Sequence, residues 1–154
     1  MCNRIIVLFI LLFIPFGAQA LKPSVHGSAL VYTTKGNFTD VKNDVVDAIL
    51  ADGMVISYVA HVKSMLDRTA KAAGVKVSVY DNGETILTCK SGLSHDLAKA
   101  NPHHIVLCPW GISVYTLKGK PNTVYVSIRQ PYKDEKSYMA VHKMLQEIIK
   151  DALD

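Results

Sequence analysis

The stretch Ile105–Leu117 reads Ile-Val-Leu-Cys-Pro-Trp-Gly-Ile-Ser-Val-Tyr-Thr-Leu and is the longest strand-like run in the chain. Pro109 and Gly111 interrupt it near its start, which indicates an edge position, a bulge or a bend there. A loop over residues 118–122 follows, and the run Thr123–Ile128 then alternates as a hairpin partner does. This part of the sequence therefore predicts two adjacent strands, around which the other elements are placed.

Shorter strands and helices precede this hairpin. Turn residues and runs of β-branched or alternating apolar residues predict three strands, over Leu30–Thr34, Met54–His61 and Glu84–Cys89. Helical spacing and capping residues predict three helices: one from Thr39 or Asp40 to Gly53, one over Val62–Ala73, and one from Ser91 or Ser94 to Asn101. A turn is expected at Asp81-Asn82-Gly83, just before the third strand.

A longer amphipathic helix follows the hairpin. Apolar residues recur at helical spacing from Tyr138 to Ala152, which predicts a helix over residues 134–153. The resulting order is β-α-β-α-β-α-β-β-α, without a regular parallel alternation of strands and helices. This order favours an α+β fold over a doubly wound one.

The first twenty residues have the composition of a secretory signal. Arg4 supplies a positive charge, Ile5–Phe16 is almost entirely apolar, and Ala18-Gln19-Ala20 fits the small-residue cleavage site. The apolar run is shorter than the roughly twenty residues that a membrane-spanning helix needs. We expect residues 1–20 to be a cleaved signal peptide and residues 21–154 to form a single domain without stable membrane insertion. The mature protein is then expected to be periplasmic or secreted.

The charge pattern does not indicate a nucleic-acid partner. The formal net charge is +4, and the lysines and arginines are scattered rather than gathered in a basic run. A solvated surface accounts for such a pattern. The sequon Asn37-Phe38-Thr39 is relevant only in a host that glycosylates exported proteins.

Four short motifs carry a resemblance to a known family. They are Thr88-Cys89-Lys90-Ser91, the following helix with Leu97, Asn101-Pro102, and Leu107-Cys108-Pro109-Trp110-Gly111-Ile112-Ser113-Val114-Tyr115. Together they resemble the bacterial and archaeal domain of unknown function 302 (DUF302) family, in which a strand, a short helix and a Leu-Pro-like turn lead into a strand that ends near an aromatic residue. The resemblance extends from Leu30 to Arg129. It includes no invariant catalytic residue, so it implies a fold rather than an activity.

The DUF302 resemblance implies a TATA-binding-protein-like arrangement, in which helices pack on one face of an antiparallel sheet. It also implies a homodimer, because members of the family often pair and a partner would cover exposed strand edges. The chain departs from many cytoplasmic relatives in its signal sequence and in Cys89 and Cys108. The activity of those relatives is therefore not carried over.

Five residues that could bind a metal or undergo redox chemistry fall close together in the sequence: Cys89, His95, His103, His104 and Cys108. If the strands beside the two cysteines run antiparallel, as the resemblance implies, Cys89 and Cys108 lie at the same edge of the sheet and could form a disulfide. An exported protein meets an oxidising compartment, which favours this alternative.

Two other interpretations of these residues stay open. Thiolate and imidazole ligands suit zinc or copper, so Cys89 and Cys108 with His95, His103 or His104 could hold a metal or a haem. Their spacing, however, matches no standard metal-site signature. In the third interpretation one cysteine is activated for thiol–disulfide exchange, because Cys89 precedes a predicted helix start, where the helix dipole would lower the pKa of a thiol.

A ligand site is also expected near the proline-interrupted strand, with His95 and Trp110 as candidate ligand-binding residues. The contiguous residues Ser94-His95-Asp96 cannot form a hydrolase triad, because triad groups converge from separate elements. We therefore expect an exported binding or accessory module that holds a small ligand or metal near Cys89–Trp110, rather than an enzyme. The alternatives are a thiol–disulfide redox protein that uses Cys89 and Cys108, and a structural dimer without a ligand.

Overall fold

The computed structural model describes residues 21–131 and 136–154, so the predicted signal peptide lies outside the described residues. The elements are β1 (Ser24–His26), β2 (Ala29–Lys35), α1 (Phe38–Ala51), β3 (Val55–Ala60), α2 (Val62–Thr69), β4 (Tyr80–Cys89), α3 (Ser91–Ala100), the 3₁₀ helix η1 (Pro102–Leu107), β5 (Trp110–Leu117), β6 (Thr123–Arg129) and α4 (Tyr138–Leu153). Within these two ranges, no helix has the length and apolar character needed to cross a membrane.

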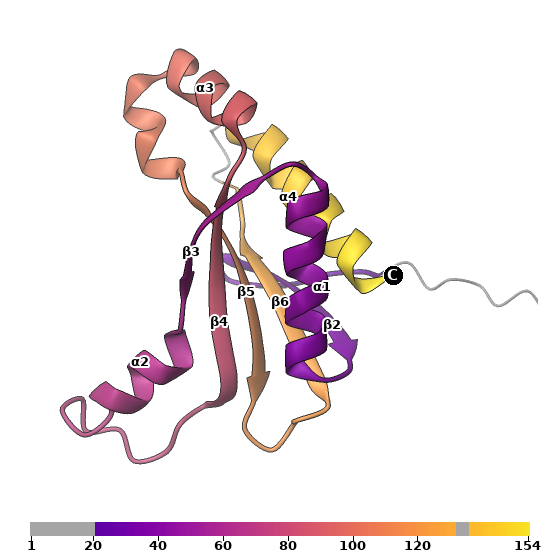
Figure 1. The fold of residues 1–154 in the computed structure, drawn as a ribbon. Helices are drawn as coiled ribbons and strands as arrows, with labels where there is room; N and C mark the ends of the chain where they lie inside the picture. Colours follow the sequence, from indigo (N-terminus) through magenta and orange to yellow (C-terminus); the bar gives the residue numbers. More distant parts are fainter. Residues whose placement is uncertain (1–20, 132–135) are drawn as a thin grey trace, which may run out of the picture.

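The six described strands form one antiparallel sheet in the order β1-β2-β6-β5-β4-β3. The predicted hairpin, β5 and β6, lies in the middle of this sheet (Figure 1). Its register places Ile112 opposite Ile128 and Val114 opposite Val126. Because side chains alternate along a strand, these four residues project to the same face.

Helices α1 and α4 pack against each other across that face (Figure 1). Helical spacing buries Val41, Val45 and Ile49 of α1. They belong to the same core as the fully buried strand residues Ile112 and Val126. Burying one side chain of this size stabilises the fold by roughly 1.5–3 kcal/mol. The two helices and the sheet therefore enclose the hydrophobic core.

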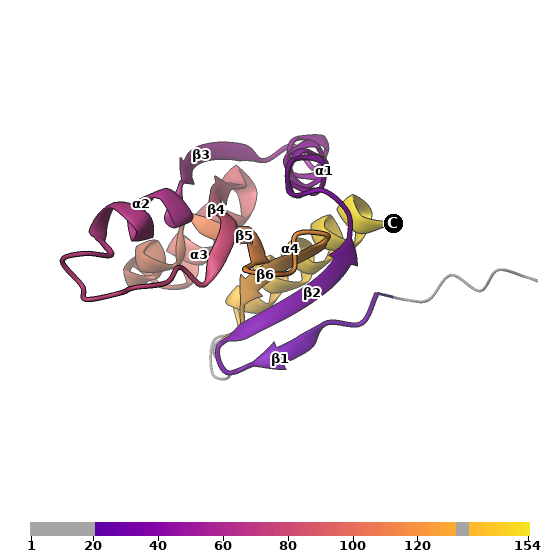
Figure 2. The ribbon, with the colours of Figure 1, turned by 90° about the horizontal axis from the view of Figure 1, so that it is seen from below.

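The opposite face of the sheet is only partly covered. The residues that alternate with the core positions, such as Thr85, Ser113 and Ser127, are half-buried. Helix α2 borders this open face, because a Cβ added at Gly83 would lie 3.6 Å from the Cβ of Lys63 in α2. Figure 2 shows α1 and α2 on opposite sides of β4. The open face is therefore the part of the sheet on which a site can form.

The residues at the two ends of α1 determine where the helix starts and stops. The Asn37 side chain accepts a hydrogen bond from the backbone N–H of Thr39 at 2.8 Å, so Asn37, rather than the predicted Thr39 or Asp40, caps the helix. Gly53 has a φ of 72°, the left-handed conformation that glycine adopts after a helix. The predicted end of this helix is confirmed.

The predicted turn at Asp81-Asn82-Gly83 is wrong, because these residues belong to β4. The backbone N–H and the side-chain amide of Asn82 both donate to Oγ1 of Thr116, each at 3.1 Å. These bonds hold Asn82 against β5 across a register shift between Tyr80 and Asn82. A bulge thus keeps turn-forming residues within a strand.

The strand predicted from Ile105 begins only at Trp110. Residues 102–107 form η1, which starts where the side chain of Asn101 accepts a hydrogen bond from the backbone N–H of His103 at 2.9 Å. Ile105 and Val106 are 79% and 82% exposed, so the apolar run does not mark a buried strand here.

Two further differences concern the ends of the domain. The sequence did not predict the short edge strand β1. The last helix begins at Tyr138 rather than at residue 134, and residues 134 and 135 lie outside the described residues. Apart from β1 and η1, the predicted order of elements is found, and the α+β class with helices packed on an antiparallel sheet is confirmed.

Candidate functional site

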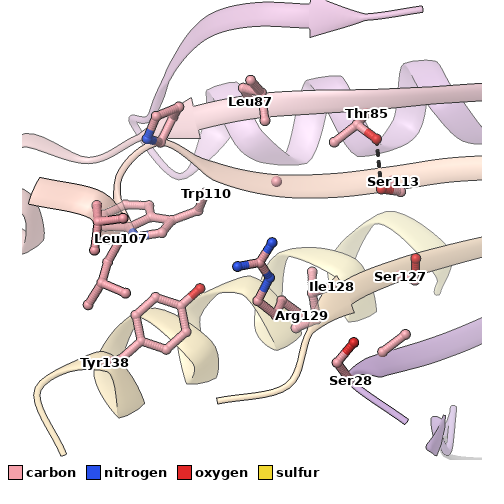
Figure 3. A pocket seen from close by; sticks show the side chains of 14 residues that line it. Ser28, Thr85, Leu87, Leu107, Trp110, Ser113, Ser127, Ile128, Arg129 and Tyr138 are labelled. Atoms are coloured by element: carbon pink, nitrogen blue, oxygen red, sulfur yellow. Dashed lines mark hydrogen bonds between the residues drawn. The ribbon is translucent and has the colours of Figure 1, made fainter. Parts of the chain in front are cut away.

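A pocket lies on the open face of the sheet, where β4, β5 and β6 meet η1 (Figure 3). Its volume is about 520 Å³, within the range of roughly 300–1,000 Å³ that small-molecule sites occupy. Apolar side chains, among them Leu87, Leu107 and Trp110, form one part of its wall, and hydroxyl groups form another. A pocket of this size and lining suits an organic molecule with a polar and an apolar part.

Three hydroxyl side chains form a row across the floor of this pocket. The sheet register pairs Thr85 with Ser113 and Ser113 with Ser127. Oγ1 of Thr85 and Oγ of Ser113 are hydrogen-bonded at 2.8 Å (Figure 3). Each hydroxyl can both donate and accept, so the row can bind a ligand's polar groups of either kind.

Arg129 is the only charged residue among the described residues that line the pocket. It ends β6, and strand alternation places it on the same face as Ser127. Tyr138, the first residue of α4, also lines the pocket, and Figure 3 shows its hydroxyl and the Arg129 guanidinium directed toward the same part of it. A guanidinium can donate two parallel hydrogen bonds to a carboxylate, so this end of the pocket can bind an acidic group.

Trp110 lies in the pocket wall, near the position where the sequence predicted a ligand site. Its side chain is buried, and its Nε1–H has no hydrogen-bond partner among the described residues. Buried polar groups in folded proteins nearly always pair with the protein or with ordered water. The indole N–H therefore marks a place where a water or an acceptor atom would be favourable.

Gly111 keeps the pocket open. A Cβ at this position would lie 3.1 Å from Cγ2 of Thr85 and 3.4 Å from Cδ2 of Leu87. The first of these contacts is tighter than ordinary van der Waals contact, so a side chain would push its neighbours aside and occupy pocket space.

A smaller hollow of about 250 Å³ continues the pocket along the same face toward α2. It shares Thr85, Ser113 and Ser127 with the pocket, so the two form one groove across the hydroxyl row. Glu84 also contributes to the lining of this hollow. Because it alternates with Thr85 along β4, its carboxylate projects toward α1, where it pairs with Nζ of Lys42 at 3.3 Å and with Nδ1 of His61 at 3.0 Å.

The structure brings the two predicted thiols together. Cys89 ends β4, and Cys108 immediately precedes Pro109 and β5. Their Sγ atoms lie 2.6 Å apart and are not bonded to each other. The Ser94 hydroxyl lies 3.6 Å from Sγ of Cys108. Leu107 and Pro109, the two sequence neighbours of Cys108, both line the pocket. The thiol pair therefore adjoins the pocket wall.

The surroundings of Cys89 do not favour a thiolate. Burial, the hydrogen bond with the Cys108 thiol and the charge interaction with that thiol together raise the pKa of Cys89 to about 12. A nucleophilic cysteine instead needs a pKa near or below the ambient pH. The raised pKa therefore argues against the activated thiol that the sequence suggested at this residue.

The three histidines of the same segment lie away from the pocket. His95 and His103 are exposed, and Nδ1 of His104 donates to the Leu97 carbonyl at 3.2 Å. None of the three lines the pocket, so the expected pairing of His95 with Trp110 at one ligand site is not formed. The physical reason is that His95 lies on the exposed side of α3.

The predicted metal ligands are not assembled into a donor set. In residues 21–131 and 136–154, no three His, Cys, Asp or Glu side chains are grouped so as to hold a metal ion. Cys89 and Cys108 meet, whereas His95, His103 and His104 do not complete a group with them. Cys89 and Cys108 by themselves do not supply the three or four protein ligands that a zinc site needs.

Comparison with known proteins supports the fold. No family model and no curated protein matches the sequence. Among solved structures, the chain is similar to the crystal structure of an uncharacterised conserved DUF302 protein from Bacillus stearothermophilus, with a TM-score of 0.56 and 15% sequence identity. The match covers 82% of this chain and 90% of that chain. At this identity the likeness shows a DUF302-like fold alone, which agrees with the resemblance found in the sequence.

Sequence reasoning missed the polar part of the pocket. The predicted strand Thr123–Ile128 ends just before Arg129, and the sequence pattern predicts Tyr138 as part of an apolar helix stripe. The alternation in Thr123–Arg129 was the available signal, because it puts Ser127 and Arg129 on the face opposite the core.

Proposed function

We propose that this chain is an exported module that binds a small organic molecule in the pocket at Trp110. The observation that carries the proposal is the pocket of about 520 Å³, in which a hydroxyl row and an arginine converge beside an apolar wall. A well-formed pocket with a few convergent polar groups is the default ligand site of a domain of this kind. Export is supported by the composition of residues 1–20.

Amide chemical-shift perturbation against a library of small organic molecules tests this proposal. Shifts are expected to cluster at Gly111, Ser113 and Ser127. The Gly111→Val variant should abolish them, because its side chain fills the pocket floor. Gly92→Val adds the same side chain on α3, where a Cβ meets no atom within 4 Å, and should leave them unchanged. Shifts elsewhere, or shifts that persist in folded Gly111→Val, would contradict the proposal.

The Cys89–Cys108 pair is proposed to be a structural disulfide in the exported protein. The proposal is supported by the contact between the two sulfur atoms and by the oxidising compartment that an exported protein meets. Bond formation removes two protons and two electrons from the thiols, and a disulfide of the compartment's oxidant accepts them. Intact mass with thiol labelling, on protein purified without reductant, should show no label and the loss of two hydrogens. Two labelled thiols would contradict the bond.

The module is further proposed to pair with itself through the edge strand β3. This strand ends the described sheet and exposes Val55 and Tyr58 to 68% and 62%. Exposed apolar edges are sites of strand pairing between chains. Sedimentation velocity should show a dimer that Tyr58→Lys converts to monomer, whereas Val25→Lys on the opposite edge should not. A wild-type monomer, or a dimer insensitive to Tyr58→Lys, would refute this pairing.

A further inference from the structure

We propose that the Cys89–Cys108 pair controls ligand binding in the adjoining pocket: the disulfide fixes the η1 wall of the pocket, so the oxidised protein binds its ligand more tightly than the reduced protein does. This inference rests on the proposed ligand-binding function and adds the regulation of that site. It follows from the position of the two thiols on the sheet and from the way the segment before Cys108 is held.

The thiol pair lies on the pocket side of the sheet. Along β4, Cys89 comes two residues after Leu87 and four after Thr85, and both of these residues line the pocket. Because side chains alternate along a strand, all three project to the open face, whereas the intervening Thr88 is fully buried on the opposite face. Sγ of Cys89 meets Sγ of Cys108 at 2.6 Å. The pair therefore borders the pocket at the end of β4.

A bond between the two cysteines would connect two parts of the pocket lining. The sequence neighbours of Cys108, Leu107 and Pro109, line the pocket. Leu107 comes from η1, whereas Leu87 comes from β4 (Figure 3). A covalent link from Cys108 to Cys89 joins these elements directly, and it limits how far Leu107 can move from Leu87.

Without this bond, η1 is held only lightly against the rest of the domain. None of the residues Pro102–Leu107, all of which the structure describes, is buried, and only Leu107 packs partly against the core. Ile105 and Val106 are exposed to solvent. Segments with few buried apolar contacts open at a low cost in free energy. The reduced protein must therefore order this segment when it binds a ligand, whereas the disulfide orders it in advance, and such pre-organisation raises affinity.

Oxidation forms one S–S bond between Cys89 and Cys108. The two thiols give up two protons and two electrons, which reduce a disulfide of the compartment's oxidant to two thiols. Coupling between such a reaction and ligand binding is reciprocal, so a ligand that prefers the oxidised form shifts the thiol–disulfide equilibrium toward the disulfide by the same factor. Coupled sites typically change each other's affinity by about 5- to 150-fold, and a change of about tenfold is expected here.

The binding experiment uses 2-naphthol and 4-phenylbutan-1-ol, each of which combines an apolar body for the Leu107 wall with one hydroxyl for the row at Ser113. Amide chemical shifts of Gly111 and Ser113 measure their affinity for the oxidised protein and for protein reduced with a phosphine. The temperature is one at which circular dichroism shows that both forms are folded. The reduced protein should bind about tenfold more weakly. The Cys89→Ser/Cys108→Ser double variant should bind as the reduced wild type does, with or without reductant.

A matched pair of variants tests whether the effect passes through the η1 wall. Leu107→Ala should remove most of the difference between the oxidised and reduced forms, because it removes the side chain that the bond positions. Ile105→Ala, which shortens an exposed residue of η1 outside the pocket lining, should keep the difference. In a glutathione redox buffer, 2-naphthol that saturates both forms should shift the equilibrium about tenfold toward the disulfide, which lowers its reduction potential by about 30 mV.

Each outcome bears on the inference separately from the proposed function. Equal affinity of the oxidised and reduced protein would overturn the inference and leave ligand binding at this pocket intact, as would thiols that stay unbonded in oxidised glutathione. Binding of neither probe to either form would overturn both. A tenfold difference that persists in folded Leu107→Ala, or a glutathione equilibrium that 2-naphthol does not change, would overturn the coupling through the η1 wall.

Discussion

Reduction of the proposed Cys89–Cys108 bond is expected to lower the stability of the domain while leaving its core folded. The two cysteines are 19 positions apart in the sequence. The chain-entropy model gives about 3 kcal/mol for closing a loop of that size. For a domain of this length, 1 kcal/mol corresponds to about 4 °C in melting temperature, so reduction should lower the Tm by about 12 °C.

Thermal unfolding followed by circular dichroism, with and without a phosphine reductant, measures this difference. The Cys89→Ser/Cys108→Ser double variant is the control: it should melt near the reduced wild type and should not respond to the reductant. A change in Tm of less than about 2 °C, in protein whose thiols are shown by labelling to be fully reduced, would refute the entropic reasoning.

The effect of reduction should also be local. Cys108 joins η1 to β5, so the bond holds the segment Pro102–Leu107 against the end of β4. Hydrogen exchange is expected to become faster in this segment than in α1, whose inner side is packed in the core. If hydrogen exchange became faster by the same factor in Pro102–Leu107 and in α1, the disulfide would act on global stability alone.

Three further predictions concern the core and two titrating groups. Ile112→Ala is expected to cost about 3 kcal/mol, because removing a fully buried side chain leaves a cavity between the sheet and the helices; urea unfolding measures this, and a cost below about 1 kcal/mol would contradict it. Burial lowers the pKa of His142 below 6.5, so the unfolded chain binds a proton that the folded chain does not; stability measured by urea should fall as the pH drops through 6.5, and His142→Leu should remove that slope. In the reduced protein, folding raises the pKa of Cys89 from 9.0 to about 12, so the unfolded chain loses the thiol proton at a lower pH than the folded chain does. The free energy that the protonated thiol contributes to folding is therefore present below pH 9 and is lost as the pH rises from 9 toward 12. Thermal melts of the reduced wild type should show this loss of stability, and reduced Cys89→Ser should lack it.

The core could be predicted from the sequence because its spacing is periodic. Val141, Leu145 and Ile148 recur at helical spacing and are buried on α4, and Ile112 and Val126 alternate with polar residues on their strands. Each pattern is complete within one element. Local periodicity is therefore enough to place these residues inside.

The pocket could not be predicted in the same way, because its floor forms only when three neighbouring strands are aligned in the correct register. Thr85, Ser113 and Ser127 are ordinary strand residues on their own, and they become a row only when β4, β5 and β6 are aligned. Register depends on the whole sheet rather than on any single strand. The histidines show the converse: His95 and His103 are close in sequence to Cys108, yet α3 and η1 leave both of them exposed.

Along β5, alternate residues serve the hydrophobic core and the ligand groove. Ile112 and Val114 face the helices, whereas Gly111 and Ser113 face the groove. Codons for the two tasks are therefore interleaved in the gene while their side chains lie on opposite surfaces. Substitutions at groove positions can accumulate over generations, or be randomised in a variant library, without repacking the interior. A scaffold of this kind can change what it binds while its architecture stays constant.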